Sequence, residues 1–211
     1  MKKFISLENV TYKSTDIYSN NSATLLENIN FFVNQGEFIS IMGPNGCGKS
    51  TLARLLNGTL IPTSGEVYID GLNTKSNISE VKKKVGMVFQ NPDNQIISST
   101  VEEEIAFGLE NLCVPAKEIG SIIKNTLHEV GLDGFEKKSI NSLSGGQKQK
   151  LIIAGVLAMK PDIMVFDEPT SMLDPDSKKN ILNTRLKLKN IHKITVILIT
   201  HYINEALYSD R

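Results

Sequence analysis

The sequence predicts an α/β domain that is interrupted by a helical segment, and three observations support this fold class. Short apolar runs typical of strands occur before residue 90 and return after residue 160. A glycine-rich stretch, 43–48, joins one of these runs to a segment with helical spacing. Between residues 91 and 160, helix signals replace strand signals. We therefore expect a single domain, 1–211, with a core of about 1–90 and 161–211 and a helical subdomain of about 91–160.

Apolar and β-branched runs predict the strands, and the turn Asn34-Gln35-Gly36 separates two of them. The expected strands are 4–11, 25–33, 37–42, 67–69, 85–89, 163–166 and 194–199.

Helical spacing of apolar residues predicts helices at 49–56, 101–112, 119–130 and 144–159. Thr100 and Glu103 have the spacing of a capping box, and Gly131 is suited to end the third helix. Asp174-Pro175 combines an N-cap acid with proline at the first helical position, which predicts a further helix from Pro175.

Composition and charge exclude several classes of protein. The 211 residues are 40% hydrophobic and 22% charged, as in a soluble globular domain. Lys plus Arg equals Asp plus Glu, 23 each, so no overall positive field attracts nucleic acid. The longest apolar stretches, 151–159 and 194–200, are shorter than the roughly 20 residues of a membrane-spanning helix. With no signal-peptide core and two cysteines, the chain is expected in the cytosol, where any membrane role comes through a partner.

With Lys49 and Ser50, the glycine-rich stretch matches the phosphate-binding loop pattern in full over residues 43–50, and it lies between an apolar strand and a helix. Its glycines let backbone N–H groups surround phosphates, and the helix N-terminus favours negative charge. Lys49 is expected to reach the β- and γ-phosphates, and the Ser50 hydroxyl is expected to bind Mg²⁺. A glycine turn without a ligand is the alternative, which Lys49-Ser50 disfavours. The predicted nucleotide-binding residues here are Gly43, Pro44, Asn45, Gly46, Cys47, Gly48, Lys49, Ser50 and Thr51.

Two acids, Asp167 and Glu168, follow the apolar run Ile163-Met164-Val165-Phe166. They therefore lie at the C-terminal end of a buried strand, where open α/β sheets bind ligands. Adjacent acids there are costly unless a cation or hydrogen bonds compensate. We predict that Asp167 binds Mg²⁺ and that Glu168 is the general base for the water that attacks the γ-phosphate. An acid pair in solvent is the alternative for this segment taken alone.

A second glycine-rich helix start occurs at Ser144-Gly145-Gly146-Gln147. Bare N–H groups and the helix dipole favour an anion at such a position. Because the first loop already provides one phosphate cradle, a second is useful if it grips a nucleotide held by another subunit.

These elements, together with His201 after the run 194–200, resemble the nucleotide-binding subunits of ABC (ATP-binding cassette) transporters. The resemblance implies a P-loop NTPase (RecA-like) core with an antiparallel β subdomain and an inserted α-helical subdomain. It implies that Gln90 is the glutamine of a loop that senses the metal and hinges the helical subdomain, and that His201 contacts the γ-phosphate. It also implies that two subunits sandwich two ATP molecules, with Ser171-Met172-Leu173-Asp174 running across the interface.

A closer resemblance is carried by 85–95, 100–112, 154–159 and 200–202. These stretches are similar to energy-coupling factor (ECF) transporter ATPases of the cobalt/vitamin type, and more to the first than to the second of the two ATPase subunits. The resemblance implies ATP and Mg²⁺ as ligands, a second ATPase subunit in a homo- or heterodimer, and no nucleic acid. It further implies a transmembrane coupling subunit, a small membrane protein that captures a vitamin or metal ion, and a place on the cytoplasmic face of the cell membrane.

Three departures from the family pattern remain. Lys150 replaces the usual arginine and so lacks its guanidinium fork. Ser14 stands near the position of the aromatic that stacks on adenine, with Tyr12 or Tyr18 as possible substitutes. The chain ends at Arg211, where family members continue, so their C-terminal region is expected to be absent.

Two other functions are less consistent with the sequence. A soluble ABC ATPase acting on nucleic acid or ribosomes would usually carry basic surfaces, coiled-coil inserts or tandem cassettes, which this neutral chain lacks. An assembly module with little turnover would not need Glu168. The resemblance implies that another subunit selects the transported solute, so this sequence does not name it.

Overall fold

The N-terminal part of the chain forms an antiparallel sheet with the strand order β2-β1-β4-β5. Its strands are β1 (Lys3–Thr15), β2 (Ser22–Asn34), β4 (Ser64–Ile69) and β5 (Leu72–Asn73). In this computed structural model, residues 3–15, 22–171, 173, 178 and 193–211 are described. β1 and β2 are longer than predicted, because register shifts in their pairing interrupt the alternation of apolar residues that marks a strand.

A parallel sheet with the order β3-β8-β7-β6 forms the centre of the molecule. Its strands are β3 (Phe38–Ile41), β8 (Thr195–Ile199), β7 (Ile163–Asp167) and β6 (Val85–Val88). Every residue of β6, β7 and β8 is buried, which explains their continuous apolar runs. Met164 and Phe166 of β7 join a hydrophobic cluster with the helical segment, whereas Ile163 and Val165 join a cluster with the antiparallel sheet. The parallel sheet is therefore covered on both faces.

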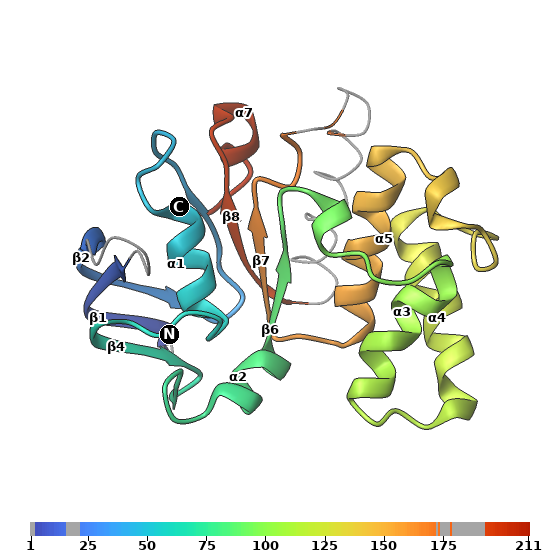
Figure 1. Cartoon of the computed structure of the whole chain (residues 1–211), viewed down its shortest axis with the longest axis horizontal. Coiled ribbons are helices and arrows are strands. Elements are labelled where there is room, and N and C mark those ends of the chain that lie inside the picture. Colours follow the sequence, from blue (N-terminus) through green and yellow to red (C-terminus); the bar gives the residue numbers. More distant parts are fainter. Residues whose placement is uncertain (1–2, 16–21, 172, 174–177, 179–192) are drawn as a thin grey trace.

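Two helices connect the sheets. α1 (Lys49–Leu56) has the predicted bounds and lies between the antiparallel and the parallel sheet (Figure 1), where Leu52, Leu55 and Leu56 are buried. α2 (Ile78–Lys84) leads into β6 and was not predicted, because only Val81 of its residues is buried.

Three helices gather at the other end of the molecule, beside β6 and β7 (Figure 1). They are α3 (Val101–Asn111), α4 (Ala116–Val130) and α5 (Gly145–Ala158). The predicted N-terminal cap of α3 is confirmed, since Thr100 N donates to Glu103 Oε2 at 3.0 Å. Gly131 is the C-cap of α4, with a left-handed φ of 69°, as predicted.

α5 packs directly on β6 through Gly86. A Cβ atom at Gly86 would lie 2.3 Å from Val156 Cγ1, so only glycine permits this approach. The helical segment and the parallel sheet thus share one hydrophobic cluster.

Short elements complete the described structure: η1 (Pro92–Asn94), η2 (Ile140–Ser142) and α7 (Ile203–Ala206). The helix predicted from Pro175 lies outside the described residues. None of the helices in the described ranges is long and apolar enough to cross a membrane.

Candidate functional site

The glycine-rich loop joins β3 to α1, and Gly48 is the N-cap of the helix. Its φ of 94° is left-handed, and a Cβ atom there would lie 2.7 Å from Leu25 O of β2. Glycine at this position therefore allows both the turn and the packing of the loop against β2. No side chain caps α1. The first N–H groups of α1 consequently have no side-chain acceptor from the cap, as a phosphate cradle requires.

Lys49 lies within the curve of this loop and is only 7% exposed. Its Nζ donates to Gly43 O at 2.9 Å and to Pro44 O at 2.8 Å. These carbonyl groups hold the ammonium beside the cavity that the loop lines.

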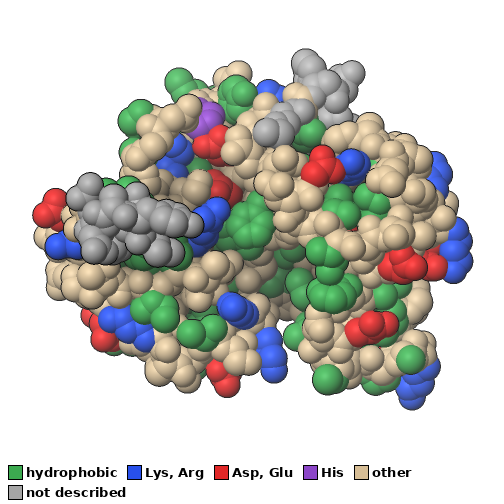
Figure 2. Space-filling view, viewed as in Figure 1, with side chains coloured by type: hydrophobic (Ala, Val, Ile, Leu, Met, Phe, Trp, Pro, Cys, Tyr) green, Lys and Arg blue, Asp and Glu red, His purple; other side chains and the backbone are tan. Residues whose placement is uncertain are grey.

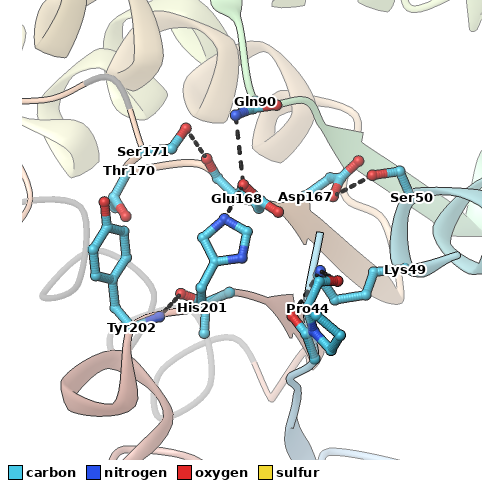
Figure 3. A network of polar contacts seen from close by, with 12 residues as sticks. Pro44, Lys49, Ser50, Gln90, Asp167, Glu168, Thr170, Ser171, His201 and Tyr202 are labelled. Carbon is cyan, nitrogen blue, oxygen red and sulfur yellow. Dashed lines mark hydrogen bonds and ion pairs between the residues drawn. The ribbon is translucent and has the colours of Figure 1, made fainter. Parts of the chain in front are cut away.

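Ser50 and Asp167 meet across the start of α1 and the end of β7. Ser50 Oγ donates to Asp167 Oδ1 at 3.1 Å (Figure 3). Burial raises the pKa of the Asp167 carboxyl, and the hydrogen bond from Ser50 partly opposes that rise. Hydroxyl and carboxylate oxygens suit Mg²⁺, which is bound in proteins by one or two such ligands together with phosphate oxygens and water. Within the described ranges, no group of three or more His, Cys, Asp and Glu could hold a metal ion.

Glu168 directly follows β7, and its backbone is left-handed, with φ at 49°. A non-glycine residue in this region is strained by about 1–3 kcal/mol and often marks a functional site. Glu168 N donates to Ile199 O at 2.9 Å, and Ser171 Oγ donates to Glu168 O at 3.1 Å. The turn is thus fixed on both sides and directs the carboxylate away from the strand.

The Glu168 carboxylate lies between the two other predicted catalytic side chains (Figure 3). Gln90 Nε2 donates to Glu168 Oε2 at 3.4 Å, and His201 Nε2 lies 2.6 Å from the same oxygen. Three residues that are far apart in the sequence are therefore brought together at one edge of the parallel sheet.

A cavity of about 530 Å³ contains most of the predicted site. Among the residues that line it are Asn45, Gly46, Gly48, Lys49, Ser50, Thr51, Gln90, Glu168, Ser171 and His201.

The second predicted cradle, Ser144 to Gln147, does not line this cavity. It forms the start of α5, where Ser144 and Gly145 are exposed. Ser144 Oγ accepts from Gln147 N at 3.3 Å, and Ser144 N donates to Gln147 Oε1 at 2.9 Å. Bare N–H groups were predicted for Ser144, Gly145 and Gly146. The prediction is wrong for Ser144, whose N–H is used because the motif is also a capping box.

The residue that would stack on adenine stays a prediction. Tyr12 packs against the core cluster of the antiparallel sheet and does not line the cavity, whereas Leu25 does. Tyr18, Met172 and Asp174 lie outside the described residues.

Gln95 is a structural contributor that the sequence analysis missed. Phe89 N donates to Gln95 Oε1 at 3.1 Å, and Gln95 Nε2 donates to Met87 O at 2.9 Å. This amide satisfies backbone groups at the edge of β6, just before Gln90.

Two residues of α5 were also missed. Gln149 is fully buried and its Nε2 donates to Phe89 O at 3.2 Å, while Lys148 Nζ contacts Asp93 Oδ1 at 2.7 Å. The helix that begins with Ser144 is thereby tied to the segment around Gln90. The polar run Gln147-Lys148-Gln149 in an otherwise apolar helix was the available signal.

The parallel sheet, the phosphate loop and the strand-end acids define a P-loop ATPase with a helical insertion. Residues 26–171 match the family model of the ABC transporters, and the chain belongs to this family, on the branch of the ECF transporter ATP-binding proteins. It is 44% identical to the energy-coupling factor transporter ATP-binding protein EcfA1 of Clostridium novyi, over 100% of this chain and 75% of that protein.

Two solved structures are similar to the whole fold. The structure of cbiO1 from Clostridium perfringens, part of the ABC transporter complex cbiONQ, has a TM-score of 0.87 and 35% identity, over 100% of this chain and 83% of that one. The dimeric ATP-binding cassette MJ0796, bound to ADP and Pi, has a TM-score of 0.86 and 32% identity, over 98% and 91%. The predicted fold and class are confirmed: the chain is an ATPase subunit that powers transport. These relatives give no support to a function on nucleic acid or ribosomes.

Proposed function

We propose that the chain binds Mg-ATP through residues 43–51 and hydrolyses it with Glu168 as general base, as one of two paired ATPase subunits. The observation that carries this proposal is the Glu168 carboxylate, which lies between Gln90 and His201 in the cavity lined by the phosphate loop. A base, its orienting partners and a phosphate cradle in one cavity are the parts that phosphoryl transfer needs.

Different residues of the phosphate loop and the strand ends would bind the phosphates and the Mg²⁺ ion. Two of the three donors of Lys49 are used by loop carbonyl groups, and the third can reach a phosphate oxygen. Ser50 and Asp167 would hold Mg²⁺, which supplies positive charge to the phosphate oxygens when it is bound. The N–H groups at the start of α1 add further donors.

Glu168 then acts on the attacking water. Its carboxylate accepts a proton from the water as the water attacks the γ-phosphate. Gln90 and His201 hold this carboxylate in position from two sides. His201, which also lines the cavity, would contact the γ-phosphate. Gln90 links this step to the metal, because it lies on the same edge of the sheet as Asp167.

The second subunit, identical or related, would bring its own Ser144, Gly145, Gly146 and Gln147 to the nucleotide. Ser144 and Gly145 are exposed, and the motif lies outside the cavity of its own chain, so its first residues are available to a partner. The dimeric cassette bound to ADP and Pi supports such an arrangement.

The membrane partner would bind the groove between α3 and α5, which has a volume of about 350 Å³. Its lining includes Ile97 and Phe107, which are 62% and 49% exposed, and it reaches Gln95 beside the glutamine loop. Figure 2 shows hydrophobic side chains in the hollow between the sheets and the helices. An amphipathic helix of the transmembrane coupling subunit suits such a groove.

In this arrangement the chain is a peripheral subunit at the cytoplasmic face of the membrane, and residues 91–160 act as the helical subdomain that follows the partner. A substrate-capture subunit completes the transporter, and a vitamin or a metal ion is the transported solute.

Replacing Glu168 by Gln tests the proposal, because an amide cannot accept the proton of the water. The rate of hydrolysis should fall by about 10²–10⁴-fold, the usual contribution of a general base, or by more, while the purified protein still binds ATP. Glu118→Gln, at an exposed position of α4, is the matched control and should hydrolyse normally. Near-normal turnover of Glu168→Gln would contradict the assignment.

A further inference from the structure

Glu205 of α7 carries a carboxylate that is buried beside the catalytic turns, and its side chain has no role in the mechanism given above. The residue is 3% exposed, although it follows His201 by only four positions. A buried carboxylate is costly unless hydrogen bonds compensate for the lost water. The partners of this carboxylate therefore indicate why the residue is an acid.

Each carboxylate oxygen of Glu205 accepts a hydrogen bond from a threonine of a different turn. Thr170 Oγ1 donates to Oε1, and Thr200 Oγ1 donates to Oε2 at 3.0 Å. Both threonines are 1% exposed. Thr200 Oγ1 also accepts from Tyr202 N at 3.0 Å, which fixes the turn around His201.

The two threonines flank the two catalytic side chains. Thr170 lies two residues after Glu168, and Thr200 directly precedes His201. The backbone pairing of β7 with β8 ends at Asp167 and Ile199, followed by the hydrogen bond from Glu168 N to Ile199 O. Past that point the Glu205 carboxylate joins the two turns.

We propose that Glu205 is a positioning residue that sets the contact between Glu168 and His201 by bridging Thr170 and Thr200. This inference rests on the proposed roles of Glu168 and His201, whose side chains lie 2.6 Å apart. Displacing a catalytic group by about 1 Å can lower a rate about 10²-fold, so a bridge that holds both turns has a direct effect on turnover. Glu205 itself acts through the two turns rather than on ATP.

Glu205→Gln tests the bridge, since an amide offers one acceptor oxygen where the carboxylate offers two. We expect kcat to fall about tenfold or more while KM for ATP changes less than about twofold, because the phosphate cradle is untouched. Thr200→Val should reproduce this loss, and Thr200→Ser, which keeps the hydroxyl group, should restore turnover. Thr126→Val, which removes a buried hydroxyl group in α4, is the matched control and should keep full turnover.

A double-mutant cycle separates positioning from general stability. If Glu205 acts through His201, adding Glu205→Gln to His201→Ala should lower hydrolysis by less than about twofold further. The proposal would be overturned if the two substitutions lowered hydrolysis independently, so that their effects multiplied. It would also be overturned if the loss of turnover in Glu205→Gln were explained by a lower urea midpoint of unfolding. Full turnover of Glu205→Gln alongside an inactive Glu168→Gln overturns the bridge alone, whereas an active Glu168→Gln overturns the proposed function.

Discussion

The chain contains two glycine-rich helix starts, and they differ in what surrounds them. α1 begins after Gly48, without a side-chain cap, in the cavity that also holds Glu168. α5 begins after Ser144, with a capping box formed by Ser144 and Gln147, at an exposed position outside that cavity. Both starts can offer N–H groups to a phosphate, but only the first lies beside acids that can perform chemistry.

This difference suits the start of α1 to binding ATP beside the catalytic acids and the start of α5 to contacting a nucleotide on another subunit. The uncapped start of α1 leaves donors for a ligand, and Lys49 is already placed beside them. The start of α5 satisfies part of its own backbone, so it remains folded while it is exposed to solvent. In the proposed mechanism, such a chain binds ATP at the start of α1 and contributes the start of α5 to the site of the second subunit.

Of the changes at the two helix starts, one that disrupts only the second should have the largest effect. Ser144→Arg should leave ATP binding by the isolated chain within about twofold of normal, because the first cradle is intact. ATP-dependent pairing and hydrolysis should fail together, by roughly 10²–10³-fold, since the large side chain blocks a preorganised set of donors. Ser121→Arg, on an exposed face of α4, is the control and should pair and hydrolyse normally.

In the unmodified protein, activity should rise more steeply than linearly with subunit concentration. Specific activity that does not change on dilution, in a protein shown to be monomeric, would contradict the shared site.

A smaller effect is expected at the first helix start, where Cys47 serves as a probe. Cys47 is exposed in the phosphate loop, and Cys113, after α3, is an exposed internal reference. Mg-ATP should slow alkylation of Cys47 several-fold and leave Cys113 unchanged, because phosphates bound in the loop cover the thiol. Mass spectrometry of each peptide measures both rates, and equal rates at Cys47 with and without Mg-ATP would count against the loop as the binding site.

The smallest effect concerns the acid beside this first helix start. Burial raises the pKa of Asp167 above its ordinary value of 3.8, so ionising Asp167 destabilises the folded protein relative to the unfolded chain. The penalty is full above the folded-state pKa and disappears as the pH falls through that value towards 3.8. Asp167→Asn should therefore raise the unfolding temperature of the nucleotide-free protein at pH 7, and this advantage should shrink as the pH falls.

Thermal unfolding followed by circular dichroism at several pH values measures this difference. An advantage of Asp167→Asn that stays constant from pH 7 to about 4 would show that ionisation of Asp167 is not its cause.

Local patterns were sufficient for much of the fold. The bounds of α1 and the end of α4 at Gly131 were predicted, because glycines and apolar spacing act within a few residues. α2 was missed because a short helix with one buried residue has little periodicity to detect. The catalytic candidates were found because each follows an apolar strand.

Contacts between residues that are distant in the sequence could not be predicted from local patterns. Glu205 contacts Thr170 and Thr200, which are 35 and 5 positions away, and a hydroxyl partner leaves no spacing pattern in a sequence. The capping box at Ser144 and Gln147 had a visible pattern, but the same residues also matched a phosphate cradle, and one interpretation concealed the other.

The close approach of α5 to β6 at Gly86 is a point about which this helix could tilt. Val156, the residue of α5 that lies against Gly86, is 12 residues from Ser144, which is about 18 Å along the helix at 1.5 Å per residue. A tilt of about 10° around that contact would move Ser144 by roughly 3 Å, more than the tolerance of a hydrogen bond. Near this end of α5, Lys148 contacts Asp93 after Gln90, and Gln149 donates to Phe89 O just before Gln90. If a membrane partner binds the groove between α3 and α5 as proposed, a small tilt of α5 would be enough to bring Ser144 to a nucleotide on the second subunit or to withdraw it.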